Sequence, residues 1–201
     1  MRSGDMLQTA LDFLEKCGVW GLFAATAIEA SSLPFPGATF VLIYGYLMDV
    51  STWQLVAISA LNSLVYVVFS LIPYYIGKYL GNLTQKKFDE KKVKKAQDWF
   101  QKYGEWSITL SRPTGFGNYI SYISGISDIS VWRFGLLSYL GVFPWNTLLL
   151  FIGNYGSLET VEHFLAMTRK VGVMITIILV FAAAFILWYY LKKNKEQKQH
   201  I

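Results

Sequence analysis

The residues of this chain with the clearest chemical potential are two charges that stand inside apolar sequence, Glu29 and Arg112. Arg112 is followed at once by Pro113, and then by Gly115 and Gly117. Proline and glycine interrupt a helix, so the backbone here should expose free N–H groups beside the guanidinium. Such a combination binds a phosphate-sized anion. The pattern predicts an anion site, against the simpler alternative of an arginine that only extends to a membrane interface.

Glu29 precedes a second break of the same kind, in which Pro34, Pro36 and Gly37 interrupt the apolar run. One interpretation of Glu29 is a structural ion pair with Arg112. The other is a carboxylate that takes up and releases a proton in an apolar setting. An ion pair that breaks and re-forms with protonation would couple the site to a proton gradient, so both interpretations stay open.

Three further residues complete the predicted substrate site, and no catalytic group accompanies them. Asn118 and Ser111 lie near Arg112, and Pro36 belongs to the first break. His163 and His200 are far apart, and the chain has no spacing typical of metal ligands, nucleophile elbows or phosphate-binding loops. We therefore expect no enzyme, no metal and no cofactor, and coupling to protons through Glu29 is left open.

The composition is that of a membrane protein. Of the 201 residues 54% are hydrophobic and 15% are charged, where a soluble domain has about a quarter charged. Segments 53–76, 132–152 and 171–191 are each long enough to cross a hydrocarbon core, which needs about 20 residues. We expect an all-α integral membrane protein with one membrane domain, 1–201. The net charge of +5 does not indicate nucleic acid, because topology explains where the lysines gather.

Two segments, 19–48 and 105–131, each contain two apolar arms that are too short to span a bilayer. We interpret each as a re-entrant helical hairpin, with one kinked spanning helix as the alternative for 19–48. Both breaks are followed by glycines eight residues apart, namely Gly37 and Gly45, and Gly117 and Gly125. A hairpin and a spanning helix in each half, in opposite orientations, predict an inverted repeat.

The lysines set the expected orientation, because cytoplasmic segments carry the excess of positive charge. Residues 78–102 hold eight lysines, and the basic tail 192–201 holds four more. Both should face the cytoplasm, with 86–103 as an amphipathic helix on that side. Residues 1–17 are predicted to form an N-terminal amphipathic helix.

In the order and spacing of these features the chain resembles the DedA family of small membrane proteins. The resemblance covers roughly residues 15–157 and rests on Glu29, 33–37, 45–47, 74–81, 100–104, 111–113, Gly125, Phe134, Trp145 and 153–156. It implies a transporter with two re-entrant hairpins that moves a lipid between leaflets. It also implies undecaprenyl phosphate or phosphatidylethanolamine as the lipid, and dependence on the proton-motive force.

The chain departs from the family pattern where Ala38 and Ser70 replace acids and Asn118 replaces a second arginine. A lone arginine suits a singly charged phosphodiester better than a phosphate monoester. We therefore predict a multi-pass flippase or scramblase of a bacterial plasma membrane that favours phosphatidylethanolamine. Undecaprenyl phosphate recycling, proton-coupled antiport of a small ion and a non-transporting scaffold are the alternatives, and homo-oligomerisation is left open.

Overall fold

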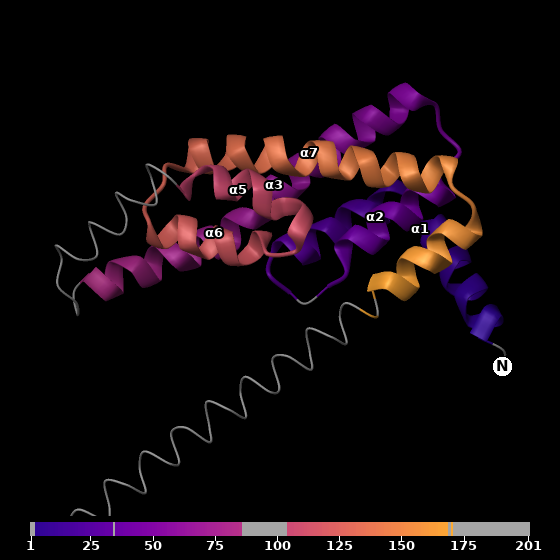
Figure 1. Cartoon of the computed structure of the whole chain (residues 1–201), viewed down its shortest axis with the longest axis horizontal. Helices are drawn as coiled ribbons and strands as arrows, with labels where there is room; N and C mark the ends of the chain where they lie inside the picture. Colours follow the sequence, from indigo (N-terminus) through magenta and orange to yellow (C-terminus); the bar gives the residue numbers. More distant parts are fainter. Residues whose placement is uncertain (1–2, 34, 86–103, 169, 171–201) are drawn as a thin grey trace, which may run out of the picture. The chain divides into compact units, whose positions relative to one another are not determined.

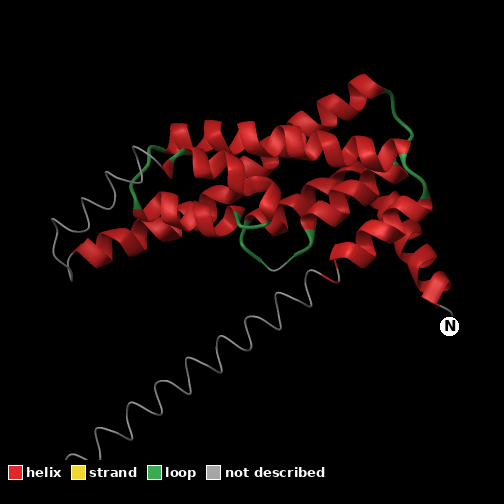
Figure 2. Cartoon of the chain, viewed as in Figure 1, coloured by secondary structure: helices red, strands yellow, loops and turns green. Residues whose placement is uncertain are grey.

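The computed structural model describes residues 3–33, 35–85, 104–168 and 170 (Figure 1). These residues form helices joined by turns and loops, and none of them is in a strand (Figure 2). The elements are α1 (Ser3–Ala30), α2 (Gly37–Leu47), α3 (Thr52–Gln85), α5 (Trp106–Ser111), the 3-10 turn η2 (Arg112–Thr114), α6 (Gly117–Ile126) and α7 (Val131–Tyr155). The predicted segments 86–103, 171–191 and 192–201 lie outside the described residues. The chain divides after Val161 into two compact units, and all elements named above belong to the first. In the second unit, the described residues 162–168 and 170 are helical.

Helical structure is interrupted at both of the predicted breaks. α1 ends at Ala30, and α2 begins at Gly37. In the second break, α5 gives way to the η2 turn, after which Gly115 adopts a left-handed φ of 78°. A side chain would strain this conformation, so glycine lets the chain turn into α6. A kink within α1 lies at Gly18, where φ is 53°, between the predicted N-terminal helix and the first predicted hairpin.

The described helices fall into two length classes. α3 has 34 residues and α7 has 25, and both are long and apolar enough to cross a membrane. They contain the predicted spans 53–76 and 132–152. By contrast, α2 has 11 residues and α6 has 10. With a rise of about 1.5 Å per residue, these arms reach about half of a hydrocarbon core of about 30 Å.

The long helices α3 and α7 are antiparallel, as their side-chain contacts show. The contact pairs are Thr52 with Tyr155, Ser59 with Thr147, and Ser63 with Asn146. As the residue number rises in α3 it falls in α7. Polar contacts of this kind hold spanning helices together where no hydrophobic effect can.

Each short arm packs along the long helix of the other half of the chain. α6 runs parallel to α3, because Gly77 meets Tyr122 and Gly81 meets Ile126. α2 runs parallel to α7, since Gly45 meets Leu150 and Asn154 meets Met48. α2 and α6 therefore point in opposite directions. Figure 1 shows α7 passing over α5 at one end and over α2 at the other.

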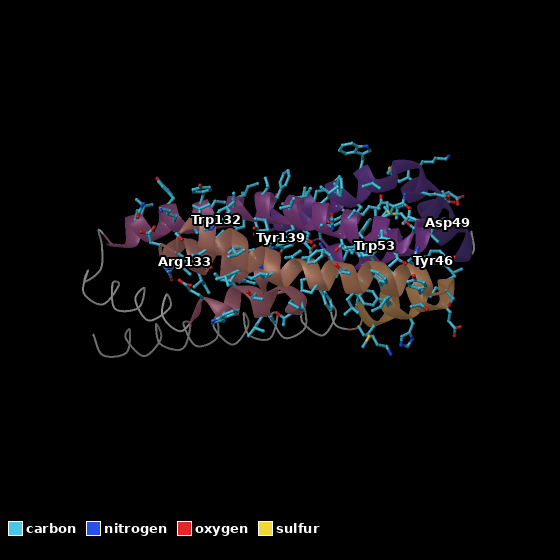
Figure 3. All side chains as sticks on the ribbon, turned by 90° about the horizontal axis from the view of Figure 1, so that it is seen from above. Tyr46, Asp49, Trp53, Trp132, Arg133 and Tyr139 are labelled. Atoms are coloured by element: carbon cyan, nitrogen blue, oxygen red, sulfur yellow. The ribbon has the colours of Figure 1, made fainter. Side chains whose placement is uncertain are left out.

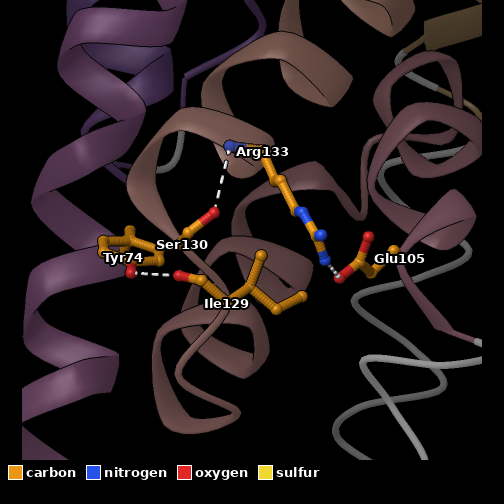
Figure 4. Close-up of polar contacts among 5 residues, drawn as sticks. All are labelled: Tyr74, Glu105, Ile129, Ser130 and Arg133. Atoms are coloured by element: carbon orange, nitrogen blue, oxygen red, sulfur yellow. Dashed lines mark hydrogen bonds and ion pairs between the residues drawn. The ribbon is translucent and has the colours of Figure 1, made fainter.

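An ion pair and a hydrogen bond connect the carboxyl ends of the short helices α6 and α2 to the long helices beside them. The Lys78 ammonium pairs with the Asp128 carboxylate at 2.7 Å, and the Asn154 amide donates to the Met48 carbonyl at 2.6 Å. In the same region as Asp128, the Tyr74 hydroxyl donates to the Ile129 carbonyl (Figure 4). Tyr74 and Ile129 also belong to a buried cluster with Ile108 and Phe134, which joins α3, α5 and α7.

Candidate functional site

Arg112 is the charge around which the candidate site is built. It stands at the first position of η2, where the second break leaves α5, and only 6% of it is exposed. Its guanidinium donates through Nη1 to the Gly117 carbonyl at 3.1 Å and to the Ser121 hydroxyl at 3.2 Å. Through Nη2 it donates to the Ser138 hydroxyl at 2.5 Å. The break therefore places a cation inside protein.

Two aromatic rings cover the guanidinium. Its central carbon lies 5.4 Å from the centre of the Tyr66 ring and 5.5 Å from that of Phe134. The Tyr66 hydroxyl also accepts a long hydrogen bond from Nη1, at 3.4 Å. The negative faces of aromatic rings attract a cation, although more weakly than a carboxylate does.

The positive charge of Arg112 has no ionic partner within the part of the chain that the structure describes. The buried Nε atom also lacks any hydrogen-bond acceptor. A buried ion is costly unless it is paired, so a cation held only by neutral groups is suited to receiving an anion. The arrangement leaves the Nε donor without an acceptor, available to such a ligand.

Glu29 lies on the last turn of α1 and is partly exposed. The expected ion pair with Arg112 is not formed: no hydrogen bond or ion pair to the Glu29 carboxylate occurs among the described residues. The carboxylate instead lies over Gly37 at the start of α2, so closely that a Cβ there would fall 1.8 Å from Oε2. Glu29 still lies within electrostatic range of the Arg112 charge.

Asn118 joins the two breaks. Its Nδ2 donates to the backbone carbonyl of Glu29 at 2.8 Å, while its Oδ1 is buried and has no partner among the residues that the structure describes. A residue on α6 therefore holds the end of α1, and it keeps one free acceptor beside the site.

The remaining predicted site residues have mainly structural contacts. Gly117 presents its carbonyl to Arg112, whereas we expected its amide to face a ligand. Gly115 and Pro36 are exposed at the two turns. The Ser111 hydroxyl donates to the carbonyl of Ile108, in its own helix, at 3.0 Å. These four residues shape the breaks, and whether any of them touches a substrate stays a prediction.

Sequence reasoning missed Tyr66 and Ser138, which contact the guanidinium from the long helices. Single tyrosines and serines are common in spanning segments, and only the packing of α3 and α7 against η2 selects these two. The sequence did place both residues in predicted spanning segments, and a polar side chain in such a segment is a signal that could have marked them as candidates. Among the described residues, no group of three or more His, Cys, Asp or Glu side chains could hold a metal.

An apolar groove of about 540 Å³ lies between α3 and α7, close to the candidate site. It is lined by Leu64, Val67, Leu71, Val131, Trp132, Gly135, Leu136 and Tyr139. Leu71 packs against the cluster that contains Phe134, whose ring faces Arg112. In Figure 3, Trp132 and Arg133 lie toward one end of the molecule, and Tyr46 and Asp49 lie toward the other. Arg133 is largely exposed and pairs with Glu105 at 3.4 Å (Figure 4).

These features define a class: a helical membrane protein with two spanning-length helices, two broken segments and a buried arginine at one break. Comparison with known proteins makes the class specific. Residues 35–155 match the VTT domain, so the chain belongs to the VTT-domain family, the DedA family that its sequence resembles. The predicted family membership is thus confirmed.

Relatives in this family span nearly the whole chain. Undecaprenyl phosphate transporter A of Staphylococcus aureus is 25% identical over 190 residues, which cover 86% of this chain and 93% of that protein. Undecaprenyl phosphate transporter A of Bacillus subtilis is 24% identical, over 92% of this chain and 95% of its own length. The uncharacterized membrane protein YkoX of Bacillus subtilis is 23% identical over 96% of this chain. No solved structure gives a significant match.

Proposed function

We propose that this protein is a transporter that carries the phosphate headgroup of a membrane lipid between leaflets, with Arg112 as the phosphate-binding residue. One observation carries the proposal: a buried guanidinium that has no carboxylate partner among the described residues and whose Nε donor has no acceptor there. A phosphate oxygen would accept from Nε and offset the charge. The lipid tail would remain in the bilayer, since only the headgroup needs a polar path.

A polyprenyl monophosphate of the undecaprenyl phosphate type is the first substrate to test. Two relatives that cover most of this chain are named for that lipid. Our sequence reasoning favoured phosphatidylethanolamine because Asn118 stands where the family commonly has a second arginine. The hydroxyls of Ser138 and Tyr66 accept from Arg112 and keep their own protons, which could be donated to a phosphate oxygen in place of a second arginine, so the lone arginine does not disfavour the monoester.

The packing of the helices supports an inverted repeat as the basis of transport. α2 lies along α7, and α6 lies along α3, with α2 and α6 in opposite directions. Two re-entrant hairpins, one open to each side, would have this arrangement. Rocking of one half against the other would then expose Arg112 to each leaflet in turn. We place the protein in the plasma membrane of a bacterium as a multi-pass protein.

Glu29 is proposed as the group that responds to the empty or occupied state of the site. Its carboxylate faces Gly37, interacts with Arg112 through space and lacks a hydrogen bond in the described structure. With the phosphate absent, a movement of the Glu29 side chain toward Arg112 would pair the two charges. With the phosphate bound, protonation would remove the repulsion between carboxylate and phosphate.

The proposal is tested by leaflet exchange in reconstituted vesicles, with labelled undecaprenyl phosphate, phosphatidylethanolamine and phosphatidylglycerol. Wild-type protein should speed exchange of the polyprenyl phosphate most. Arg112→Ala should lose exchange, and the matched control Arg133→Ala, which changes an exposed arginine, should keep it. Exchange at the wild-type rate by Arg112→Ala would exclude Arg112 as the phosphate-binding residue.

The alternatives give different results in the same vesicles. A proton-coupled small-ion antiporter would dissipate a pH gradient without any lipid substrate. A scaffold would move no lipid at all, and its activity in cells would survive both Arg112→Ala and Glu29→Ala. If phosphatidylethanolamine exchanges fastest, the protein is a lipid transporter whose preferred substrate is the one that the sequence analysis predicted.

A further inference from the structure

A layer of polar side chains lies one helical turn away from the Arg112 site. Ala30, Tyr66 and Val142 form a buried cluster where α1, α3 and α7 meet. α1 is antiparallel to α2, because Gly37 meets Glu29 while Gly21 meets Tyr44, and it therefore runs parallel to α3. One helical turn before Ala30 in α1 is Thr26, and one turn before Tyr66 in α3 is Asn62. Because α7 runs in the opposite direction, the residue at the same level is one turn after Val142, which is Asn146.

The hydrogen-bonding state of this layer is unusual for its depth. Asn62 has no exposed surface, and neither its Oδ1 nor its Nδ2 has a hydrogen-bond partner among the described residues. Thr26 is 1% exposed, and its hydroxyl likewise has no partner in the described part of the chain. Asn146 is satisfied in part, because it donates to the Ser63 hydroxyl at 3.2 Å. The large majority of buried polar groups in proteins are hydrogen-bonded to protein or to water, so the unpaired atoms of Asn62 and Thr26 suggest a ligand.

The chemistry of the layer selects that ligand. It must accept from the Asn62 amide nitrogen and donate to the Asn62 amide oxygen, and Thr26 can do either. The layer residues carry no charge, which does not suit a bare cation, and the acceptor Oδ1 does not suit a phosphate. We infer that Thr26, Asn62 and Asn146 form an internal water-binding site, in which water completes the hydrogen bonds of the Asn62 amide.

The position of the layer gives the water a role. Asn62 lies one turn before Tyr66, which touches Arg112, and Thr26 lies one turn before the partly exposed Glu29. Water bound at this layer would extend the polar surroundings of Arg112 by one helical turn into the helix bundle. The inference goes beyond the proposed transport of lipid and does not depend on it, because the water would be bound with or without a substrate.

The test is radiolytic footprinting of the full chain in phosphatidylcholine vesicles. Brief X-ray irradiation makes hydroxyl radicals from bound water, and mass spectrometry then locates the oxidised side chains. In the wild-type protein, Val142 beside the layer should oxidise faster than Leu42, which is as deeply buried but lies on α2, after correction for intrinsic reactivity. Asn62→Leu should bring the oxidation of Val142 down to the level of Leu42.

Ser70→Ala is the matched control, because it removes a buried hydroxyl of the same helix that is already paired within that helix. It should leave the oxidation of Val142 unchanged. If Asn62→Leu does not fold, as judged by size-exclusion chromatography, Thr26→Val takes its place with the same expected loss. Oxidation of Val142 no faster than that of Leu42 in the wild-type protein would overturn the inference, and so would oxidation that survives these substitutions. Neither result depends on whether the vesicles exchange lipid.

Discussion

The contact between α6 and α3 permits a sharp prediction, because one glycine there has no space for a side chain. A Cβ on Gly125 would lie 2.0 Å from the Tyr74 carbonyl oxygen and 2.7 Å from the Lys78 amide nitrogen. Both obstacles are backbone, which a rotamer change cannot move aside. Real Cβ contacts essentially never fall below 3.0 Å, so Gly125→Ala must push the two helices about 1 Å apart.

Overpacking of this kind costs about 1–3 kcal/mol of stability. A better helix propensity would return up to about 1 kcal/mol. For a chain of this size, each kcal/mol shifts the melting temperature by about 2–4 °C. Gly125→Ala should therefore lower the melting temperature by several degrees in detergent, measured by thermal unfolding with a fluorescence readout.

Gly135→Ala is the matched control, and the sign of its effect should be opposite. Gly135 lies within α7, and its Cβ would meet nothing closer than a Val67 methyl group at 3.6 Å, an ordinary contact. The same substitution should therefore raise the melting temperature through helix propensity alone. Equal shifts for the two variants, or a higher melting temperature for Gly125→Ala, would refute the close packing of α6 on α3.

Three further predictions concern the polar contacts. Ser138→Ala removes an acceptor from the buried guanidinium of Arg112 and should cost about 1.5–3 kcal/mol of stability, read as a lower melting temperature; an unchanged value would show that this bond is not maintained. Glu29→Gln keeps the shape of the side chain but cannot bind a proton. Vesicles that contain this variant should still exchange lipid, but the exchange rate should no longer respond to a pH gradient. An unaltered response would show that Glu29 does not couple exchange to protons. Lys78→Met breaks an exposed pair with Asp128 and should change stability by no more than about 1 kcal/mol, so a large fall in melting temperature would contradict that assignment.

Much of the local structure was encoded in the order of the residues. Proline fixes φ and removes a backbone donor, and glycine disfavours a helix while permitting a left-handed turn, so the breaks near Gly37 and after Arg112 could be located from the sequence. The length of the apolar runs likewise predicted α3 and α7, because a bilayer requires about 20 apolar residues for a spanning helix. Family membership followed from the same features and is confirmed by the match to the VTT domain.

The surroundings of Arg112 were decided only by tertiary structure. Tyr66 lies 46 residues before it and Ser138 lies 26 residues after it, and the faces that α3 and α7 turn toward η2 depend on how the helices pack. The sequence also suggested an ion pair with Glu29, whereas packing places that carboxylate over Gly37. Sequence could name the charge, because a lone arginine in an apolar run is visible locally. Its partners come from other helices, and only the packed bundle determines which side chains reach it.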